Sequence, residues 1–348
     1  MNHLDCLLRM DDCEFDHSGI ACQAHTTRFE VRGGKVHTKL PRSGKVGNPF
    51  HEEIEFGSNY TGVKKQSISI KGLDYSIEDG TPLLSLFKIN YALMQNVHFD
   101  LMEIKECSLN DNDCPSIHVY HPGVNAMNIQ KVILKDNTGM SETSFDFTGD
   151  NVNIEELISD NSQGVMKLTN VKVQKMKVSD HLFGENNSRF SLYVNTVIKN
   201  LTIKDSKANQ LGVNGIFRDG SCFVDELNLI NCEFESSGQN VIFEAKFMKI
   251  NMDNVKFNAS SVDGLHDKIF YCRGSERTDI VANNILLRSK GPVSPTHTPF
   301  ISYESTVLDG YVYLNNVRYE YIATPAVINF DPSKVIKLNC EPLFITAN

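Results

Sequence analysis

Short stretches of alternating apolar and polar residues repeat along this chain. Around each of ten apolar anchor residues, the positions three before, five before and two after are almost all apolar. The anchors are Leu73, Val97, Val132, Leu157, Met176, Leu201, Leu227, Val255, Ile285 and Val317. Apolar residues two positions apart lie on the same side of a β-strand, so each repeat predicts a pair of strand segments with one inward face. A short motif that recurs with insertions of variable length is typical of a solenoid.

The three-residue step before each anchor predicts a bend, because strict alternation cannot cross an odd interval. In six repeats the residue just before the anchor is glycine or asparagine, and these types tolerate the left-handed backbone conformation that a tight corner requires. The six are Gly72, Asn96, Asn200, Asn254, Asn284 and Asn316, while Lys131, Glu156, Lys175 and Glu226 hold the same place in the other repeats. Asparagines stacked in successive coils are expected to form a hydrogen-bonded ladder.

A third apolar stretch lies upstream of most motifs and predicts a third strand in each coil. The stretches are 83–89, 116–120, 144–148, 189–194, 239–245, 268–272, 299–303 and 326–330. Three short strands per turn predict an all-β fold, a parallel β-helix solenoid of about ten to twelve coils. Helical spacing never persists beyond one turn, and hairpin signals are too few for a β-sandwich.

The repeated motif and its asparagine corner resemble the right-handed parallel β-helix superfamily of pectate-lyase-like enzymes, polygalacturonases and bacteriophage tailspikes. The resemblance covers roughly residues 60–345, and it is closest to tailspike and depolymerase proteins. It implies right-handed coils, in keeping with the general preference for right-handed crossovers. We expect one continuous β-helix domain at 61–348, preceded at 1–60 by irregular N-terminal coils or a cap.

Composition narrows the classes of partner. A net charge of −9 argues against nucleic acid, and it disfavours acidic polymers unless a local basic groove exists. No apolar run reaches the length of a membrane span, and the acidic N-terminal residues do not resemble a signal peptide. Nine cysteines without CxxC spacing predict synthesis in a reducing cytoplasm, without a disulfide framework. No nucleotide motif or convergent metal-ligand cluster is present, so neither a cofactor nor a metal is expected.

The candidate chemistry follows from the resemblance. In the resembled families the groove runs along the outward face of the first strand of each coil and the loop after it. Glycoside hydrolysis requires two carboxylates roughly 5–5.5 Å or 6.5–9.5 Å apart, and stacked coils supply such separations. Asp219 and Glu244 lie on this track in successive coils, so they are the candidate catalytic pair. The candidate substrate-binding residues on or near the track are Tyr120, Asp146, Tyr193, Arg218, Arg273, Tyr303 and Glu304.

Several features oppose an enzymatic function. Outward acids on a solenoid are usually solvated, tryptophan is absent, and the motifs of polygalacturonases and pectate lyases are not found. Whether the protein is an enzyme, and whether a hydrolase or a lyase, therefore stays open. Apolar residues at the outward positions Ile133, Ile158 and Leu286 suggest a surface packed against a partner.

The favoured hypothesis is a tailspike-type protein that binds a bacterial surface polysaccharide, with cleavage of that polysaccharide left open. It would be made in the cytoplasm without a signal peptide and act outside the cell as a virion or tail component. Its expected protein partners are copies of itself, for example in a homotrimer, or other virion proteins. The alternative is a non-catalytic structural or adhesive component of a virion or appendage. A stand-alone pectinase-like enzyme is disfavoured by the missing motifs.

Overall fold

The computed structural model describes residues 7–16, 20–22, 28–38, 52–56, 66–77, 85–90, 97–109, 117–120, 126–138, 145–162, 166–180, 182–183, 190–192, 195–211, 221–236, 243–259, 269–272, 277–289, 299–303, 310–320, 327–342 and 344–346. The chain forms two compact units, Met1–Lys175 and Met176–Asn348. Strand β15 (Met166–Ser179) crosses the boundary between them. Each unit has its own stack of parallel strands.

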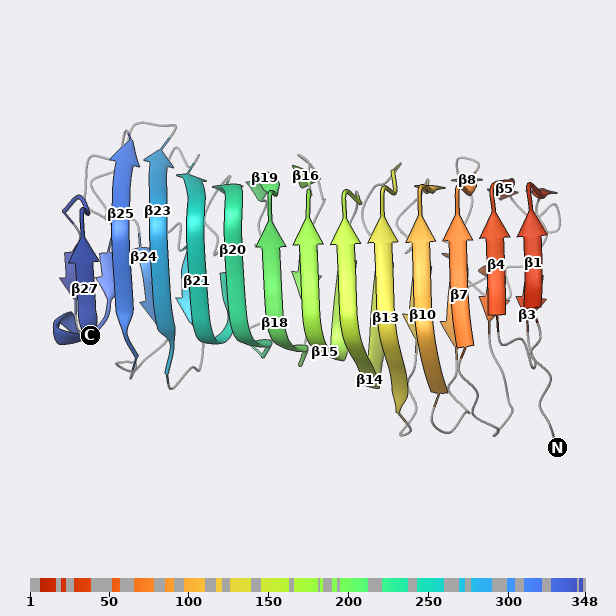
Figure 1. Ribbon diagram of the computed structural model, residues 1–348, viewed down its shortest axis with the longest axis horizontal. Helices are drawn as coiled ribbons and strands as arrows, with labels where there is room; N and C mark the ends of the chain where they lie inside the picture. The colour runs from red at the N-terminus through yellow and green to blue at the C-terminus, as the bar shows by residue number, and fades with distance from the viewer. Residues whose placement is uncertain are drawn as a thin grey trace, which may run out of the picture. The chain divides into compact units, whose positions relative to one another are not determined.

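In the first unit the long strands lie side by side in chain order (Figure 1). They are β1 (Leu7–Asp11), β4 (Arg28–Arg32), β7 (Gln66–Lys71), β10 (Val97–Lys105), β13 (Met127–Lys135) and β14 (Phe145–Asp160). Each pairs in parallel with the next, and the register stacks core residues in one column. The column contains Phe29, Ile68, Met102, Val132 and Leu157, all at most 3% exposed. This column of stacked apolar side chains forms part of the core.

Two sets of shorter strands complete the coils of the first unit. One set is β3 (Ile20–Cys22), β6 (Glu52–Phe56), β9 (Ser85–Asn90), β12 (Ile117–Tyr120) and the beginning of β14. The other set is β2 (Glu14–Asp16), β5 (Lys35–Thr38), β8 (Asp74–Ile77) and β11 (Ser108–Leu109). All of these pairings are parallel. Where the N-terminal domain boundary lies stays a prediction.

The second unit repeats this arrangement. Its long strands are β18 (Val197–Lys204), β20 (Phe223–Ser236), β21 (Phe243–Ala259), β23 (Asp279–Ser289), β25 (Val312–Glu320) and β27 (Val335–Leu338). Its short strands are β16 (Leu182–Phe183), β17 (Phe190–Leu192), β19 (Lys207–Leu211), β22 (Phe270–Cys272), β24 (Pro299–Tyr303), β26 (Val327–Asn329) and β28 (Phe344–Thr346). A single 3-10 turn, η1 (Pro332–Lys334), precedes β27 among the described residues.

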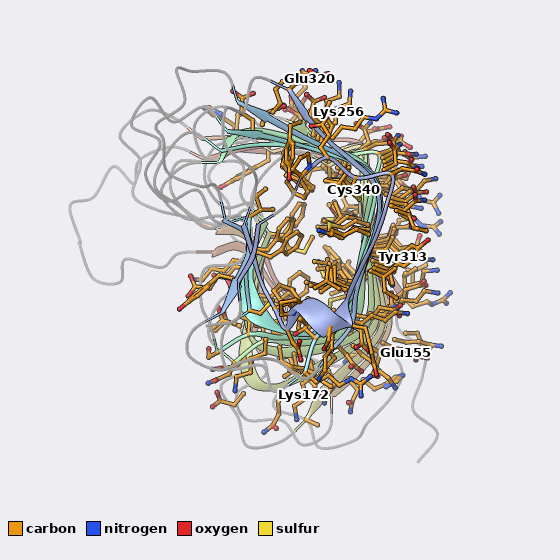
Figure 2. All side chains as sticks on the ribbon, turned by 90° about the vertical axis from the view of Figure 1, so that its left-hand side faces the viewer. Glu155, Lys172, Lys256, Tyr313, Glu320 and Cys340 are labelled. Carbon is orange, nitrogen blue, oxygen red and sulfur yellow. The ribbon has the colours of Figure 1, made fainter. Side chains whose placement is uncertain are left out.

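The structure confirms the all-β parallel solenoid. The predicted third strands coincide with β9, β12, the beginning of β14, β17, the beginning of β21, β22, β24 and β26. Seen end-on in Figure 2, side chains such as Lys256 and Tyr313 lie on the outer side of the strands. Handedness of the coils stays an expectation from the resemblance.

The corners are displaced from the predicted positions in the middle of the chain. A residue with left-handed backbone lies four positions after each aligned core residue, with φ between +44° and +67°, whereas Asn170 and Asn195 are left-handed at other places in their coils. The corner residues are Asp12, Gly33, Gly72, Glu106, Asp136, Asn161, Asp180, Asp205, Asn231, Asn254, Asn284, Asn316 and Asn339. The prediction is confirmed at Gly72, Asn254, Asn284 and Asn316. It is wrong at Lys131, Glu156, Lys175, Asn200 and Glu226, none of which has a left-handed backbone, and Asn96 lies outside the described residues.

The displacement has a simple cause. Each coil contains two places where successive inward residues are three positions apart, and these two steps are themselves five positions apart. The sequence alone does not show which of the two steps contains the residue with left-handed backbone. Leu227 is in register with Ile250, five residues before the anchor Val255. The anchors of different repeats therefore belong to two different columns of stacked core residues.

The expected hydrogen-bonded ladder is present along the corners. In the first unit, Asn161 Nδ2 donates to Asp136 Oδ1 at 2.7 Å. In the second unit, Asn231 donates to Asp205 at 2.9 Å, Asn254 donates to Asn231 at 3.0 Å and Asn316 donates to Asn284 at 2.9 Å. The corner side chains thus bind neighbouring coils to each other outside the core.

Strand β27 carries a charge in a column that is otherwise apolar. Leu229, Met252, Ala282 and Leu314 follow one another in register and are at most 2% exposed, whereas the next residue of the column is the exposed Lys337. A further strand added to β27 would bury this ammonium group. Inward-pointing charges are a known means of protecting sheet edges from association.

We expect Lys337→Leu to make the protein associate through β27 at concentrations where the wild type sediments as a single species. Removing the ammonium group removes the desolvation cost that opposes strand addition. Sedimentation velocity of both proteins over a concentration series measures the effect. Lys256→Leu, at an exposed outer position on β21, is the matched control. Equal sedimentation of the two variants would show that Lys337 does not protect the edge.

Candidate functional site

The predicted groove face of the first unit corresponds to the short strand β12 and the beginning of β14. Val119 and Phe147 lie opposite each other and are at most 1% exposed, so they belong to the core. The alternate register positions place His118 opposite Asp146 and Tyr120 opposite Thr148. Two of the predicted substrate-binding residues, Tyr120 and Asp146, are therefore on neighbouring strands.

Asp146 is buried in spite of its charge. It is 7% exposed, and it is the one charged residue among the buried residues that the structure describes. Thr148 Oγ1 donates a hydrogen bond to Asp146 Oδ1 at 2.6 Å, and Lys167 Nζ lies 3.4 Å from Asp146 Oδ2. A buried carboxylate is costly unless it is paired and hydrogen-bonded. Both oxygens are held, so this carboxylate has a fixed orientation.

The groups around Asp146 are better suited to binding a ligand than to catalysis. A fixed carboxylate, a hydroxyl and an ammonium group are the kinds of polar groups that orient a polar ligand. The residue opposite Asp146 on β12 is His118, not a second acid, so this pair of strands does not place two carboxylates opposite each other as glycoside hydrolysis would use them.

The second unit contains the described half of the predicted catalytic pair. Glu244 is half-buried on β21, opposite Tyr271 on β22, and Tyr271 lies opposite Ser302 on β24. Tyr303 lies opposite Cys272, which is 1% exposed and belongs to a buried column. Tyr303 therefore occupies a different column of register positions from Glu244 and Tyr271. Asp219, Tyr193, Arg218, Arg273 and Glu304 lie outside the described residues. The Asp219–Glu244 pair stays a prediction.

Sequence reasoning did not assign Thr148, Lys167 or His118 to this face. Thr148 stands two residues after Asp146, so strand alternation could have found it. Lys167 belongs to a later segment, and only the folded geometry brings its ammonium group to Asp146. Tyr271 was not among the candidate residues either, and the register places it opposite Glu244 on the neighbouring strand.

Three of the buried cysteine thiols are poor nucleophiles. Burial raises the pKa of the Cys107 and Cys232 thiols to about 11 and that of Cys272 to about 12. These thiols are therefore protonated near neutral pH, and the thiolate is the nucleophilic form. In the part of the chain that the structure describes, no three His, Cys, Asp or Glu side chains gather closely enough to bind a metal ion.

No protein-family model, curated protein or solved structure matches this chain. Among the described residues, no helix has the length and apolar character that a membrane span requires.

Proposed function

We propose that this protein is a carbohydrate-binding β-helix of the bacteriophage tailspike type, and that the outer face around Asp146 contacts a bacterial surface polysaccharide. One observation carries the proposal. Asp146 is a buried carboxylate on the outer side of a strand and is held by Thr148 and Lys167, and Thr148 lies opposite Tyr120 in the parallel register. A carboxylate of fixed orientation accepts hydrogen bonds from sugar hydroxyls without first losing conformational freedom.

The repeated coils support this function physically. Strands stacked at roughly 4.8 Å present binding groups in a line, which suits a long polymer. Glu244 and Tyr271 lie opposite each other on neighbouring strands of the second unit. Aromatic rings beside hydrogen-bonding groups bind the flat faces of sugar rings. Under this proposal the protein acts outside the cell as a virion component and assembles with copies of itself or with other virion proteins.

The alternative, a structural or adhesive component without an active site, is favoured by the outer face of the long strands. Glu226 in the second unit accepts hydrogen bonds from Asn200 at 2.8 Å and Asn251 at 2.9 Å, and Lys249 lies 3.3 Å from it. In the first unit, Lys131 lies 3.1 Å from Glu156. These side chains connect neighbouring coils, so they are engaged in holding the solenoid together.

The two functions are distinguished by Asp146→Asn, which removes the charge and keeps the side-chain shape. The protein is incubated with a panel of capsular and O-antigen polysaccharides, binding is measured by biolayer interferometry, and products are measured by mass spectrometry. We expect the wild type to bind at least one polysaccharide and Asp146→Asn to bind it at least tenfold more weakly. Discrete oligosaccharides would add a depolymerase activity, and products lighter by one water would identify a lyase.

Glu155→Gln is the matched control, because Glu155 is an exposed acid on the same strand β14. It should leave binding unchanged, and thermal unfolding of each variant shows whether the fold is intact. Should Asp146→Asn fail to fold, Thr148→Val tests the same face by removing the hydroxyl that holds the carboxylate. If no polysaccharide binds, or if the Asp146 and Thr148 variants bind as tightly as the wild type, the proposal is wrong.

A further inference from the structure

The first coil of the first unit is less deeply buried on its inward side than the coils that follow it. Leu8 and Met10 of β1 are half-buried, whereas Phe29 and Val31, which lie opposite them on β4, are 0% and 4% exposed. Cys13, just after the corner, is also half-buried. β1 is the first in the row of long strands of this unit (Figure 1) and pairs with β4 along one edge. No strand among the described residues pairs with its other edge.

An open strand edge of this kind promotes association. Its backbone N–H and C=O groups can pair with another strand, and the half-buried apolar side chains beside them then leave water. Terminal repeats of solenoids normally carry polar residues that prevent such contacts. The inward column holds Lys337 at β27, whereas both inward positions of β1 are apolar. The β1 edge therefore lacks the kind of charge that protects the β27 edge.

The outward side chains of β1 carry opposite charges two positions apart. Arg9 Nη2 lies 2.8 Å from Glu30 Oε2, and Arg32 Nη2 lies 3.2 Å from the same oxygen. Asp11 is opposite Arg32 in the register, but Arg32 pairs with Glu30 instead, and Asp11 has no ion-pair partner among the described residues. The exposed carboxylate of Asp11 can therefore pair with a cation of another chain.

This spacing of charges is self-complementary in an antiparallel pair of two β1 strands. In the register centred on Met10, Arg9 of one copy lies opposite Asp11 of the other copy, and the two-fold axis forms this pair twice. The same register places Met10 opposite Met10 on the inward side, where the flexible thioether chains can pack together. The register centred on Arg9 would instead place two guanidinium groups opposite each other, which is unfavourable.

We propose that the β1 edge is the contact surface for a second copy of this chain, which docks end to end through its own β1 in the antiparallel register centred on Met10. A head-to-tail contact is disfavoured, because it would bury Lys337 of one copy against Leu8 and Met10 of the other. A two-fold contact uses the same surface of both copies and closes at a dimer. The inference does not rest on polysaccharide binding and does not involve the Asp146 face.

Sedimentation velocity of the full chain over a concentration series tests the contact. The wild type should form a dimer, and Met10→Lys, which gives β1 the kind of inward charge that Lys337 gives β27, should weaken the dimer at least tenfold. Asp11→Arg and Arg9→Asp should each weaken it as well, because each sets like charges opposite each other. An equimolar mixture of these two variants should dimerise again, because opposite charges then meet. Glu155→Arg, at an exposed acid of β14, is the matched control and should leave the dimer unchanged.

Several outcomes would overturn the inference. It is wrong if the wild type is a monomer at every concentration, if folded Met10→Lys dimerises as tightly as the wild type, or if the mixture associates no better than Asp11→Arg or Arg9→Asp alone. The mixture keeps the test decisive should Met10→Lys fail to fold. Hydrogen exchange should show protected β1 amides in the dimer, and a monomer with the same protection would mean that the chain covers its own edge.

The contact and the proposed function fail separately. Asp146→Asn should dimerise as the wild type does, because Asp146 lies on β14 and not at the β1 edge. Folded Met10→Lys should bind polysaccharide through the Asp146 face as the wild type does. A dimer without polysaccharide binding would overturn the proposed function alone, and polysaccharide binding by a monomer would overturn the β1 contact alone.

Discussion

Asn137→Ala is expected to lower the free energy of unfolding by about 2–6 kcal/mol. Asn137 is fully buried just after a corner of the first unit, where the other coils carry mostly small or apolar residues. Its Oδ1 accepts a hydrogen bond from the Cys107 backbone N–H at 3.1 Å, and its Nδ2 donates to the Ile104 carbonyl at 3.0 Å and to Ser162 Oγ at 3.1 Å. Alanine leaves two backbone groups without these partners, and each unsatisfied buried group costs about 1–3 kcal/mol.

Urea unfolding followed by circular dichroism measures this loss, and hydrogen exchange of the Cys107 amide localises it. The control is Asn153→Ala, which removes an exposed amide whose Nδ2 donates to Asn128 Oδ1 at 3.1 Å. Surface substitutions of this kind change stability by no more than about 0.5 kcal/mol. If both variants unfold at the wild-type urea concentration, Asn137 does not hold the coils of the first unit together.

Phe270→Ala should have the second large effect, a loss of about 3–5 kcal/mol in the second unit. Phe270 is fully buried, and its ring stacks on Phe243 with centroids 4.8 Å apart. Phe257 and Phe247 meet it edge-on at 5.9 Å and 6.4 Å. Alanine leaves a cavity among these rings, because the strands around it are fixed by hydrogen bonds to neighbouring coils and cannot close in.

Thermal and urea unfolding, with intrinsic tyrosine fluorescence as the probe, test this expectation. Phe270→Leu retains most of the volume and should lose less stability than Phe270→Ala. Met248→Ala is the exposed control of the same unit, expected to stay within about 0.5 kcal/mol of the wild type. Equal stability of the leucine and alanine variants would mean that the aromatic cluster is not tightly packed.

The fold class was predictable because each coil has the same inward faces. The alternation of Leu227, Asn228 and Leu229 is visible in the sequence, and both leucines are buried in β20. The third strands were found for the same reason. The corner was misplaced where two inward steps look alike, since Asn200 satisfies the residue preference of a corner yet lies within β18, whereas Asp205 makes the turn. The backbone conformation of a single residue depends on the residues beside it in the neighbouring coils. The sequence does not show which residues of neighbouring coils are in register.

The candidate site was predictable only at the level of the strand. Asp146 and Tyr120 were placed on one outward track, and the parallel register brings their strands together. The burial of Asp146 and its contact with Lys167 depend on how successive coils stack, so no spacing rule reveals them.

The corner ladder also determines how asparagine deamidation would affect the protein. Slow hydrolysis of an asparagine amide yields aspartate, which exchanges a hydrogen-bond donor for a charged acceptor. At Asn254 that change would set a carboxylate against the Asn231 oxygen that now accepts its hydrogen bond. Deamidation of Asn284 and Asn316 as well would place like charges next to each other on neighbouring strands, and such charges destabilise strand pairing. Deamidation would thus loosen the second unit from its surface inward, while the apolar columns of its core stay chemically intact.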